Sequence, residues 1–155
     1  MKYSKINAMK NVAQIKLARQ AQASAFISVT QGNECMVIMV ADPAESMMRV
    51  GYRIGSRHPL DQGAAGIAIL SGRKALPNDS EAVIQARELG YSLTRGQLQP
   101  GAIGVASPIS CPHDQHSFEA CVGVVALNSL DLDIATQAVP RTAAIITQLL
   151  GAAPT

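Results

Sequence analysis

Aromatic side chains are scarce in this 155-residue chain, which contains no tryptophan. Phenylalanine and tyrosine together make up only 3% of the residues. Proteins that hold single-stranded nucleic acid stack its bases on aromatic side chains. The scarcity therefore argues against a single-strand nucleic-acid binder. The aromatic residues are Tyr3, Phe26, Tyr52, Tyr91 and Phe118.

Charged residues are also few, at 15%, whereas hydrophobic residues reach 48%. This balance is typical of a folded globular protein and not of a disordered one. A chain of this length is expected to form one domain over residues 1–155, with a hydrophobic core of its own. No hydrophobic run approaches the ~20 residues that a membrane-spanning helix needs, so no membrane association is predicted.

Cysteine is limited to Cys35, Cys111 and Cys121, an odd number with irregular spacing. Such a set does not form a disulfide framework. The N-terminus has no apolar stretch of the kind found in secretory signals. Both observations predict a cytoplasmic protein with reduced thiols. No phosphate-binding loop, Ser/His/Asp order or pair of carboxylates in an apolar stretch is evident, so we predict no cofactor and no enzymatic activity.

Positive charge is concentrated at the start of the chain. Five of the 13 basic residues precede the first acidic residue, Glu34, which leaves eight basic and 11 acidic residues for the remainder. The pattern predicts a basic helix within residues 1–24. Its charges are either a solvated helix face or a surface for DNA or an acidic partner. The five basic residues are Lys2, Lys5, Lys10, Lys16 and Arg19.

Hydrophobic periodicity predicts an α+β chain in which strands follow one another through short turns, which favours an antiparallel sheet with helices packed on it. Asp79 or Ser80 is the expected N-cap of the third helix, and Pro140 is expected to bend the last helix or begin a second segment. Residues 91–101 are rich in turn formers. The expected helices cover residues 5–24, 62–71, 80–89 and about 131–151, and the expected strands cover 25–30, 35–41, 47–54, 102–109 and 120–127.

The second helix begins with almost no side chains, in the sequence GAAG at residues 63–66. The first turn of a helix leaves backbone N–H groups without partners and carries partial positive charge, so it binds anions readily. Asp61 is the expected N-cap for one of these donors. The small residues either leave the other donors open to a ligand oxygen or let the helix pack tightly on its neighbour. Positive potential is expected from the preceding residues Arg53, Arg57 and His58.

A second group of chemically active residues lies in the sequence CPHDQH at residues 111–116. Cys111, His113 and His116 carry thiolate and imidazole groups, which are good zinc ligands. Their spacing is not that of a standard structural zinc site, so solvated loop residues remain the main interpretation. Cys121 follows nearby, and a thiol enzyme would need such a pair of cysteines within reach of each other.

Several motifs in fixed order resemble the effector-binding domain of the IclR family of transcriptional regulators. They are GSRHPL followed by AAGIAIL, then ARELGY, then PGAIGVASPI, and the similarity extends over residues 8–152. The resemblance implies a GAF-like fold, a curved antiparallel sheet flanked by the N- and C-terminal helices, with a ligand pocket on one face. It also implies homodimers or tetramers. The family reads DNA through a separate helix-turn-helix domain, and this chain has no candidate recognition helix of its own.

The resemblance places the start of the second helix, with Gly63, Ala64 and Ala65, beside the effector pocket. Many members of the family have a Thr- or Ser-bearing turn and a Lys in this helix, whereas this chain has only small residues followed by Ile67. The matching turn after ARELGY falls near Thr94 and Arg95. Further wall residues follow from strand alternation, namely Gly104 and Ala106 in one strand and Val124 and Ala126 in the next.

Small and apolar wall residues predict a roomy, apolar pocket suited to an organic acid with a large or aromatic body. The function that we infer from the sequence is effector sensing by a transcriptional regulator. Two alternatives stay open at this point: a stand-alone GAF-type thiol enzyme and a dimerisation module without a ligand.

Overall fold

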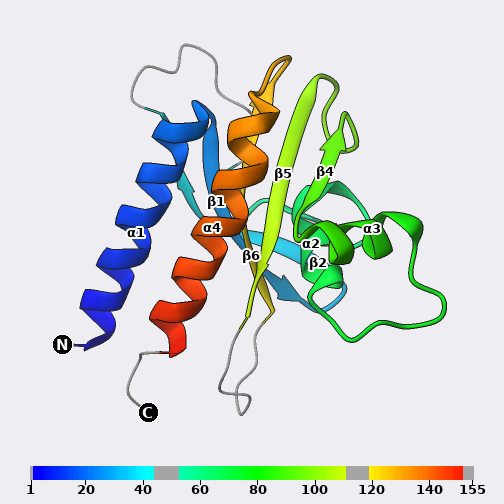
Figure 1. The fold of residues 1–155 in the computed structure, drawn as a ribbon, viewed down its shortest axis with the longest axis horizontal. Coiled ribbons are helices and arrows are strands. Elements are labelled where there is room, and N and C mark those ends of the chain that lie inside the picture. Colours follow the sequence, from blue (N-terminus) through cyan, green and yellow to red (C-terminus); the bar gives the residue numbers. More distant parts are fainter. Residues whose placement is uncertain (1, 44–52, 111–118, 152–155) are drawn as a thin grey trace.

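The computed structural model describes residues 2–43, 53–110 and 119–151, apart from the side chains of residues 2–10. These ranges form four helices and six strands (Figure 1). The helices are α1 (Lys2–Ala21), α2 (Gly63–Ser71), α3 (Glu81–Leu89) and α4 (Leu132–Gly151). The strands are β1 (Ser24–Gln31), β2 (Glu34–Ala41), β3 (Arg57–Pro59), β4 (Ser92–Arg95), β5 (Ala102–Ile109) and β6 (Ala120–Leu127).

The six strands form one antiparallel sheet in the order β3-β2-β1-β6-β5-β4. The central pair, β1 and β6, joins strands from the two ends of the chain. A register shift between Ile27 and Ser28 interrupts the β1–β2 ladder, and such shifts bend and twist a strand. The predicted α+β fold, with a curved antiparallel sheet flanked by the N- and C-terminal helices, is confirmed.

The helices α1 and α4 lie side by side on one face of the sheet (Figure 1). Their contact with the sheet contains the largest cluster of buried side chains, including Leu17 of α1, Val139 of α4 and Val124 of β6, each fully buried. Gln14 is also buried there, and its Nε2 donates to the Ala25 carbonyl at 3.0 Å. Burying an amide costs little when it is hydrogen-bonded in this way.

The helix α2 covers the opposite face, and α3 packs on α2. Eight of the nine residues of α2 are buried. Gly66 explains how α2 comes so close to the preceding loop, since a Cβ on this residue would lie 2.7 Å from the carbonyl carbon of Leu60 and closer still to its oxygen. The interpretation of the small residues as a close-packing device therefore holds at Gly66.

The helix boundaries differ from prediction mainly at α1, which ends at Ala21 because Gln22 adopts a left-handed conformation with φ 50° and Ser24 already belongs to β1. Of the two expected caps of α3, Ser80 is the N-cap and accepts from the Val83 N–H at 3.3 Å. Pro140 lies inside α4, which continues through it, so the alternative of a second segment was wrong.

The two edge strands were not predicted. β3 has three residues and β4 has four, and both lie in segments that we interpreted as loop and turn. A strand was expected at residues 47–54 instead. Residues 44–52 lie outside the described part of the chain, and Arg53 and Ile54 belong to no strand. None of the described helices is both long and apolar enough to cross a membrane.

Close packing at Gly66 is testable by comparison with Gly90, the left-handed C-cap of α3, where an added Cβ meets nothing within 4 Å. Gly66→Ala is expected to lower the free energy of unfolding by about 3 kcal/mol, because the clash is with backbone atoms that cannot move aside. Gly90→Ala is expected to cost about 1 kcal/mol from its backbone conformation alone. Urea unfolding of both variants measures the difference, and equal costs would contradict the close approach of α2 to Leu60.

Candidate functional site

The start of α2 is capped by a side chain from another part of the chain. The N-cap residue is Gln62, whose side chain makes no capping hydrogen bond, so the prediction that Asp61 is the N-cap was wrong. The N–H of Gly63 instead donates to the side-chain Oε1 of Gln97 at 2.8 Å. Gly63 has φ +78°, a left-handed conformation that glycine adopts at little cost and that turns the chain into the helix.

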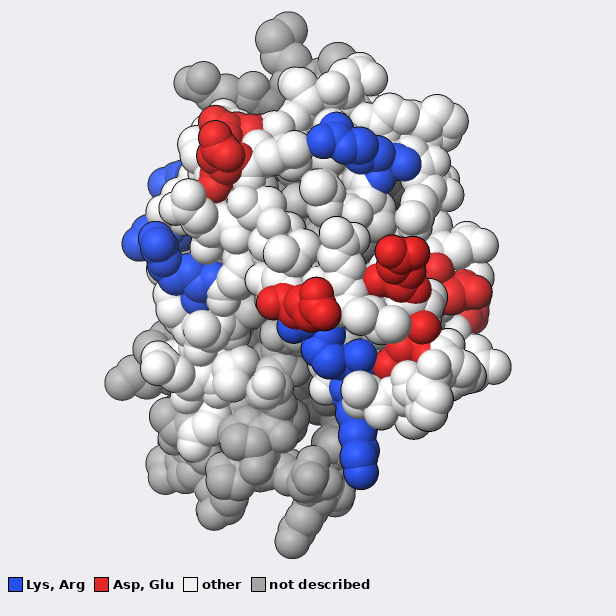
Figure 2. Space-filling view, turned by 45° about the vertical axis from the view of Figure 1, so that its right-hand side comes forward, with Lys and Arg blue, Asp and Glu red and all other residues white. Residues whose placement is uncertain are grey.

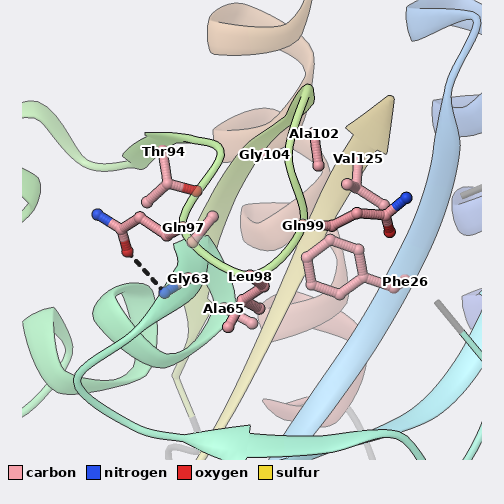
Figure 3. A pocket seen from close by; sticks show the side chains of 11 residues that line it. Phe26, Gly63, Ala65, Thr94, Gln97, Leu98, Gln99, Ala102, Gly104 and Val125 are labelled. Atoms are coloured by element: carbon pink, nitrogen blue, oxygen red, sulfur yellow. Dashed lines mark hydrogen bonds between the residues drawn. The ribbon is translucent and has the colours of Figure 1, made fainter. Parts of the chain in front are cut away.

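A small cavity lies beside this helix start, between α2, the sheet and the segment that joins β4 to β5 (Figure 3). Its volume is about 50 Å³. The cavity borders Ala64 and Gly104, as the resemblance implied, but it is not roomy. Its walls are mainly apolar, as predicted. The lining residues are Phe26, Gly63, Ala64, Ala65, Thr94, Gln97, Leu98, Gln99, Ala102, Gly104 and Val125.

Five of the eight residues that we predicted for the pocket line this cavity: Gly63, Ala64, Ala65, Thr94 and Gly104. Ala106 faces the same layer as Gly104 but is fully buried among the side chains beneath α2. Arg95 is exposed, because side chains alternate along β4 and its neighbour Thr94 points inward. Whether any of these residues binds a ligand stays a prediction.

The placement of Val124 and Ala126 on the pocket wall was wrong. Residues that pair directly across an antiparallel ladder point to the same face of the sheet. Gly104 pairs with Val125, so Val125 is the residue of β6 that lines the cavity. Val124 and Ala126 point to the other face, where they pack in the cluster beneath α1 and α4.

Among the residues that the structure describes, no charged side chain lines the cavity. Arg57 lies 3.9 Å from Glu34 in an ion pair that is about half exposed, and His58 is buried with its ring close to Gly63. On the face that Figure 2 shows, positive and negative side chains are interspersed and neither forms a continuous patch. The backbone amides of the helix start and the polar side chains around them are therefore the groups that give the cavity its electrostatic character.

Thr94 brings a polar group to the cavity wall. The residue is only 8% exposed, and its hydroxyl has no hydrogen-bond partner among the described residues. Figure 3 shows this hydroxyl on the cavity side of β4. The neighbouring Ser92 contrasts with it, since its hydroxyl donates to the Ala64 carbonyl at 2.6 Å. Among the described residues, Ser28 Oγ is the fully buried side-chain polar atom without a partner, so the Thr94 hydroxyl, which is not fully buried, remains open to the cavity.

The two thiols in the described part of the chain, Cys35 and Cys121, are buried away from solvent. Burial raises the pKa of the Cys35 thiol to about 11. Burial also raises the pKa of Cys121 well above its ordinary value, and the nearby Cys35 adds to the effect. Nucleophilic cysteines need a lowered pKa, so neither thiol is suited to catalysis.

The candidate metal ligands Cys111, His113 and His116 lie outside the described residues. Within residues 2–43, 53–110 and 119–151, no group of three or more His, Cys, Asp or Glu side chains is placed to hold a metal ion.

No protein-family model matches the sequence, and no curated protein matches it. Solved structures do match the fold. An IclR transcriptional regulator from Alicyclobacillus acidocaldarius has a TM-score of 0.79 at 19% identity, over 94% of this chain and 68% of that one. A domain of a protein assigned to the IclR family has a TM-score of 0.75 at 18% identity, over 95% and 98% of the two chains.

This chain has the IclR effector-domain fold. The transcriptional regulator YaiJ adds a third match, with a TM-score of 0.79 at 17% identity over 95% of this chain and 96% of that one. The fold that the resemblance implied is therefore confirmed, and the chain spans about two thirds of the regulator from A. acidocaldarius.

Sequence reasoning missed six residues that line the cavity of this IclR-type fold. Correct strand pairing would have found Val125. Gln97, Leu98 and Gln99, which lie between β4 and β5, gave no signal beyond a turn-rich composition. The hydrogen bond of Gln97 to Gly63 joins residues 34 positions apart, and such a bond leaves no local pattern in the sequence. The missed residues are Phe26, Gln97, Leu98, Gln99, Ala102 and Val125.

The unpartnered hydroxyl can be tested by comparison with Thr142, which is also buried but donates to the Ala138 carbonyl at 2.8 Å. Thr94→Val is expected to leave the free energy of unfolding nearly unchanged, because its hydroxyl has no protein hydrogen bond to lose and still borders the cavity. Thr142→Val is expected to lower it by about 1 kcal/mol, because a hydrogen bond is lost. Denaturant unfolding measures both, and a loss of stability in the Thr94 variant would contradict our description of its hydroxyl.

Burial of Cys35 and Cys121 predicts that neither reacts with a thiol reagent in the folded protein at pH 8. Their raised pKa values keep both thiols protonated at this pH, whereas unfolding returns them to ordinary values near 9 and exposes them. In a Cys111→Ser variant, titration with a chromogenic disulfide should give no fast-reacting thiol before urea is added and two afterwards. A fast-reacting thiol in the folded variant would reopen the thiol-enzyme hypothesis.

Proposed function

We propose that this chain is the effector-sensing domain of an IclR-type transcriptional regulator and that the cavity beside α2 receives a small organic acid or an aromatic metabolite. The observation that carries the proposal is the coincidence of three features at one place: an open space, the amide-bearing start of a buried helix and an unpartnered hydroxyl. The likeness to IclR-type regulators supports it.

The ligand chemistry in this proposal follows from the walls. The amide groups at Gly63 to Ala65 favour an oxygen with negative charge, and Thr94 supplies a further donor. Phe26, Leu98 and Val125 favour an apolar body next to that oxygen.

The cavity of about 50 Å³ is smaller than the ~150 Å³ that holds benzene in an engineered apolar cavity. An aromatic acid would therefore have to displace side chains of the β4–β5 segment. Leu98 is the candidate, because it is 44% exposed and can move outward without leaving a void in the core.

The proposed output is a change in how subunits pack. We propose that the domain forms a homodimer or tetramer in the cytoplasm and that DNA is contacted through a separate helix-turn-helix domain. Occupancy of the cavity would favour one arrangement of subunits over another to the extent that the ligand binds the two arrangements with different affinity.

The two alternative hypotheses have less support. A dimerisation module without a ligand has no need of a cavity beside Ala64 and Gly104. A thiol enzyme built on Cys35 or Cys121 would need a lowered pKa, and both pKa values are raised.

A thermal-shift screen of carboxylates tests the proposed function. An acid with an apolar body, such as benzoate, is expected to raise Tm in a concentration-dependent way, because a ligand that binds only the folded state stabilises it. Thr94→Val should weaken its binding roughly tenfold, since a hydrogen bond to a charged group is worth about 1.5 kcal/mol. The matched variant Thr142→Val, on the other face of the sheet, should bind as the wild type does.

Two results would count against the assignment. One is that no carboxylate in the panel shifts Tm at millimolar concentration. The other is that an acid binds equally well to the wild type and the Thr94 variant, which would place its site elsewhere.

A further inference from the structure

We propose that Gln97 competes with the ligand from within the protein and thereby lowers the affinity of the cavity for an acid. Its side-chain carbonyl accepts the hydrogen bond of the Gly63 N–H, and a bound acid has to replace it as the acceptor. This inference rests on the proposed function, because it concerns the regulation of the same site. Gln97 controls binding, although its own amide leaves Gly63 when the acid binds.

The first support is the contact itself. Gln97 Oε1 accepts from the Gly63 N–H at 2.8 Å, which is an ordinary length for a good hydrogen bond (Figure 3). A carboxylate oxygen is an acceptor of the same kind and would occupy the same position on this donor. Gln97 also lines the cavity, so its amide and a ligand compete for one place.

The second support is how the segment around Gln97 is held. Its two ends are fixed, since the Gly96 N–H donates to the Ala102 carbonyl and the Asn128 N–H donates to the Gly101 carbonyl, both at 2.7 Å. Gly96 and Gly101 have φ +69° and +79°, so the chain turns sharply at each end. Gln97 itself is exposed, and its side chain can leave Gly63 without disturbing these anchors.

Leu98 closes the same opening. Its Cδ1 lies 2.6 Å from the position that a Cβ on Gly63 would take, so the leucine fills the space that glycine leaves at the helix start. Gln97 thus covers the polar part of the opening and Leu98 the apolar part. A ligand with an acid group and an apolar body replaces both contacts at once.

The third support is that the competition favours an acid. Hydrogen bonds to a charged acceptor are roughly twice as strong as those between neutral groups. A carboxylate therefore displaces the neutral amide of Gln97, and it also gains the Thr94 hydroxyl, which has no partner among the described residues. The unpartnered and nine-tenths buried Thr94 shows that the helix start is more than an ordinary capped terminus.

The wild-type protein binds an acid only in the fraction of molecules in which Gln97 has left Gly63, so its apparent affinity is reduced by that fraction. A neutral hydrogen bond of about 1 kcal/mol corresponds to roughly a fivefold reduction. Removing the amide removes the competitor and leaves the anchors in place.

The experiment measures benzoate affinity by NMR titration in the full chain and in three variants. Gln97→Ala should bind benzoate about fivefold more tightly than the wild type. Gln97→Glu should bind it at least tenfold more weakly at pH 7, because its carboxylate competes for Gly63 and repels the anion. The control is Gln99→Ala, which removes the same side chain from the same cavity wall and should change affinity by less than twofold.

A measurement without ligand accompanies the titration. Hydrogen exchange of the Gly63 amide should be severalfold faster in Gln97→Ala than in the wild type and unchanged in Gln99→Ala, because Gln97 is the acceptor of this N–H among the described residues.

The outcomes separate this proposal from the one on which it rests. If benzoate binds the wild type and Gln97→Ala with equal affinity, the role of Gln97 is overturned while acid sensing stands. The same holds if the Gly63 amide exchanges equally in both proteins. If benzoate binds none of the proteins, including Gln97→Ala with its free donor, the role of Gln97 is overturned, and acid sensing is overturned as well when no carboxylate of the thermal-shift panel binds either.

Discussion

The close approach of α2 to its surroundings is the constraint on which the rest of the structure depends. Gly66 lies against the backbone of Leu60, and eight of the nine helix residues are buried. Large side chains, such as the buried Ile67 and Ile69, begin only after this contact, so the N-terminal turn of the helix offers main-chain amides and methyl groups. The features that make the site follow from packing: a bare helix start, a strand glycine at Gly104 and a small gap between them.

Two interpretations of the small residues are therefore both correct, at different positions. Gly66 serves close packing, whereas Ala64 and Ala65 border an open space. Gly104 does both, since a Cβ on it would meet the Ala64 side chain at 3.1 Å and reduce the cavity. The helix is held against the preceding loop at Gly66, and the gap remains near the helix start, where the β4–β5 segment covers it.

The sequence predicted the parts of the fold that have a local signal. Long apolar strands such as 102–109 and the capped helix ending at Gly90 were recognised because period and capping residues act within a few positions. The edge strands β3 and β4 were missed because three or four residues give no period. Alternation correctly placed Gly104 and Ala106 on one face, but the residue of β6 opposite Gly104 depends on strand register, which alternation within one strand does not determine. The contact between Gln97 and Gly63 was unpredictable for the same reason, because it joins distant parts of the chain.

The sheet is a single layer thick between the cavity and the long helices. Gly104 and Val125 border the cavity, whereas their chain neighbours Val105 and Val124 pack beneath α1 and α4. Adjacent residues of a strand share a rigid peptide plane, so β5 cannot shift on one side without shifting on the other. A molecule that displaces Gly104 thus also displaces Val105, which is one peptide bond away. It thereby alters the hydrophobic contact between the sheet and the two terminal helices.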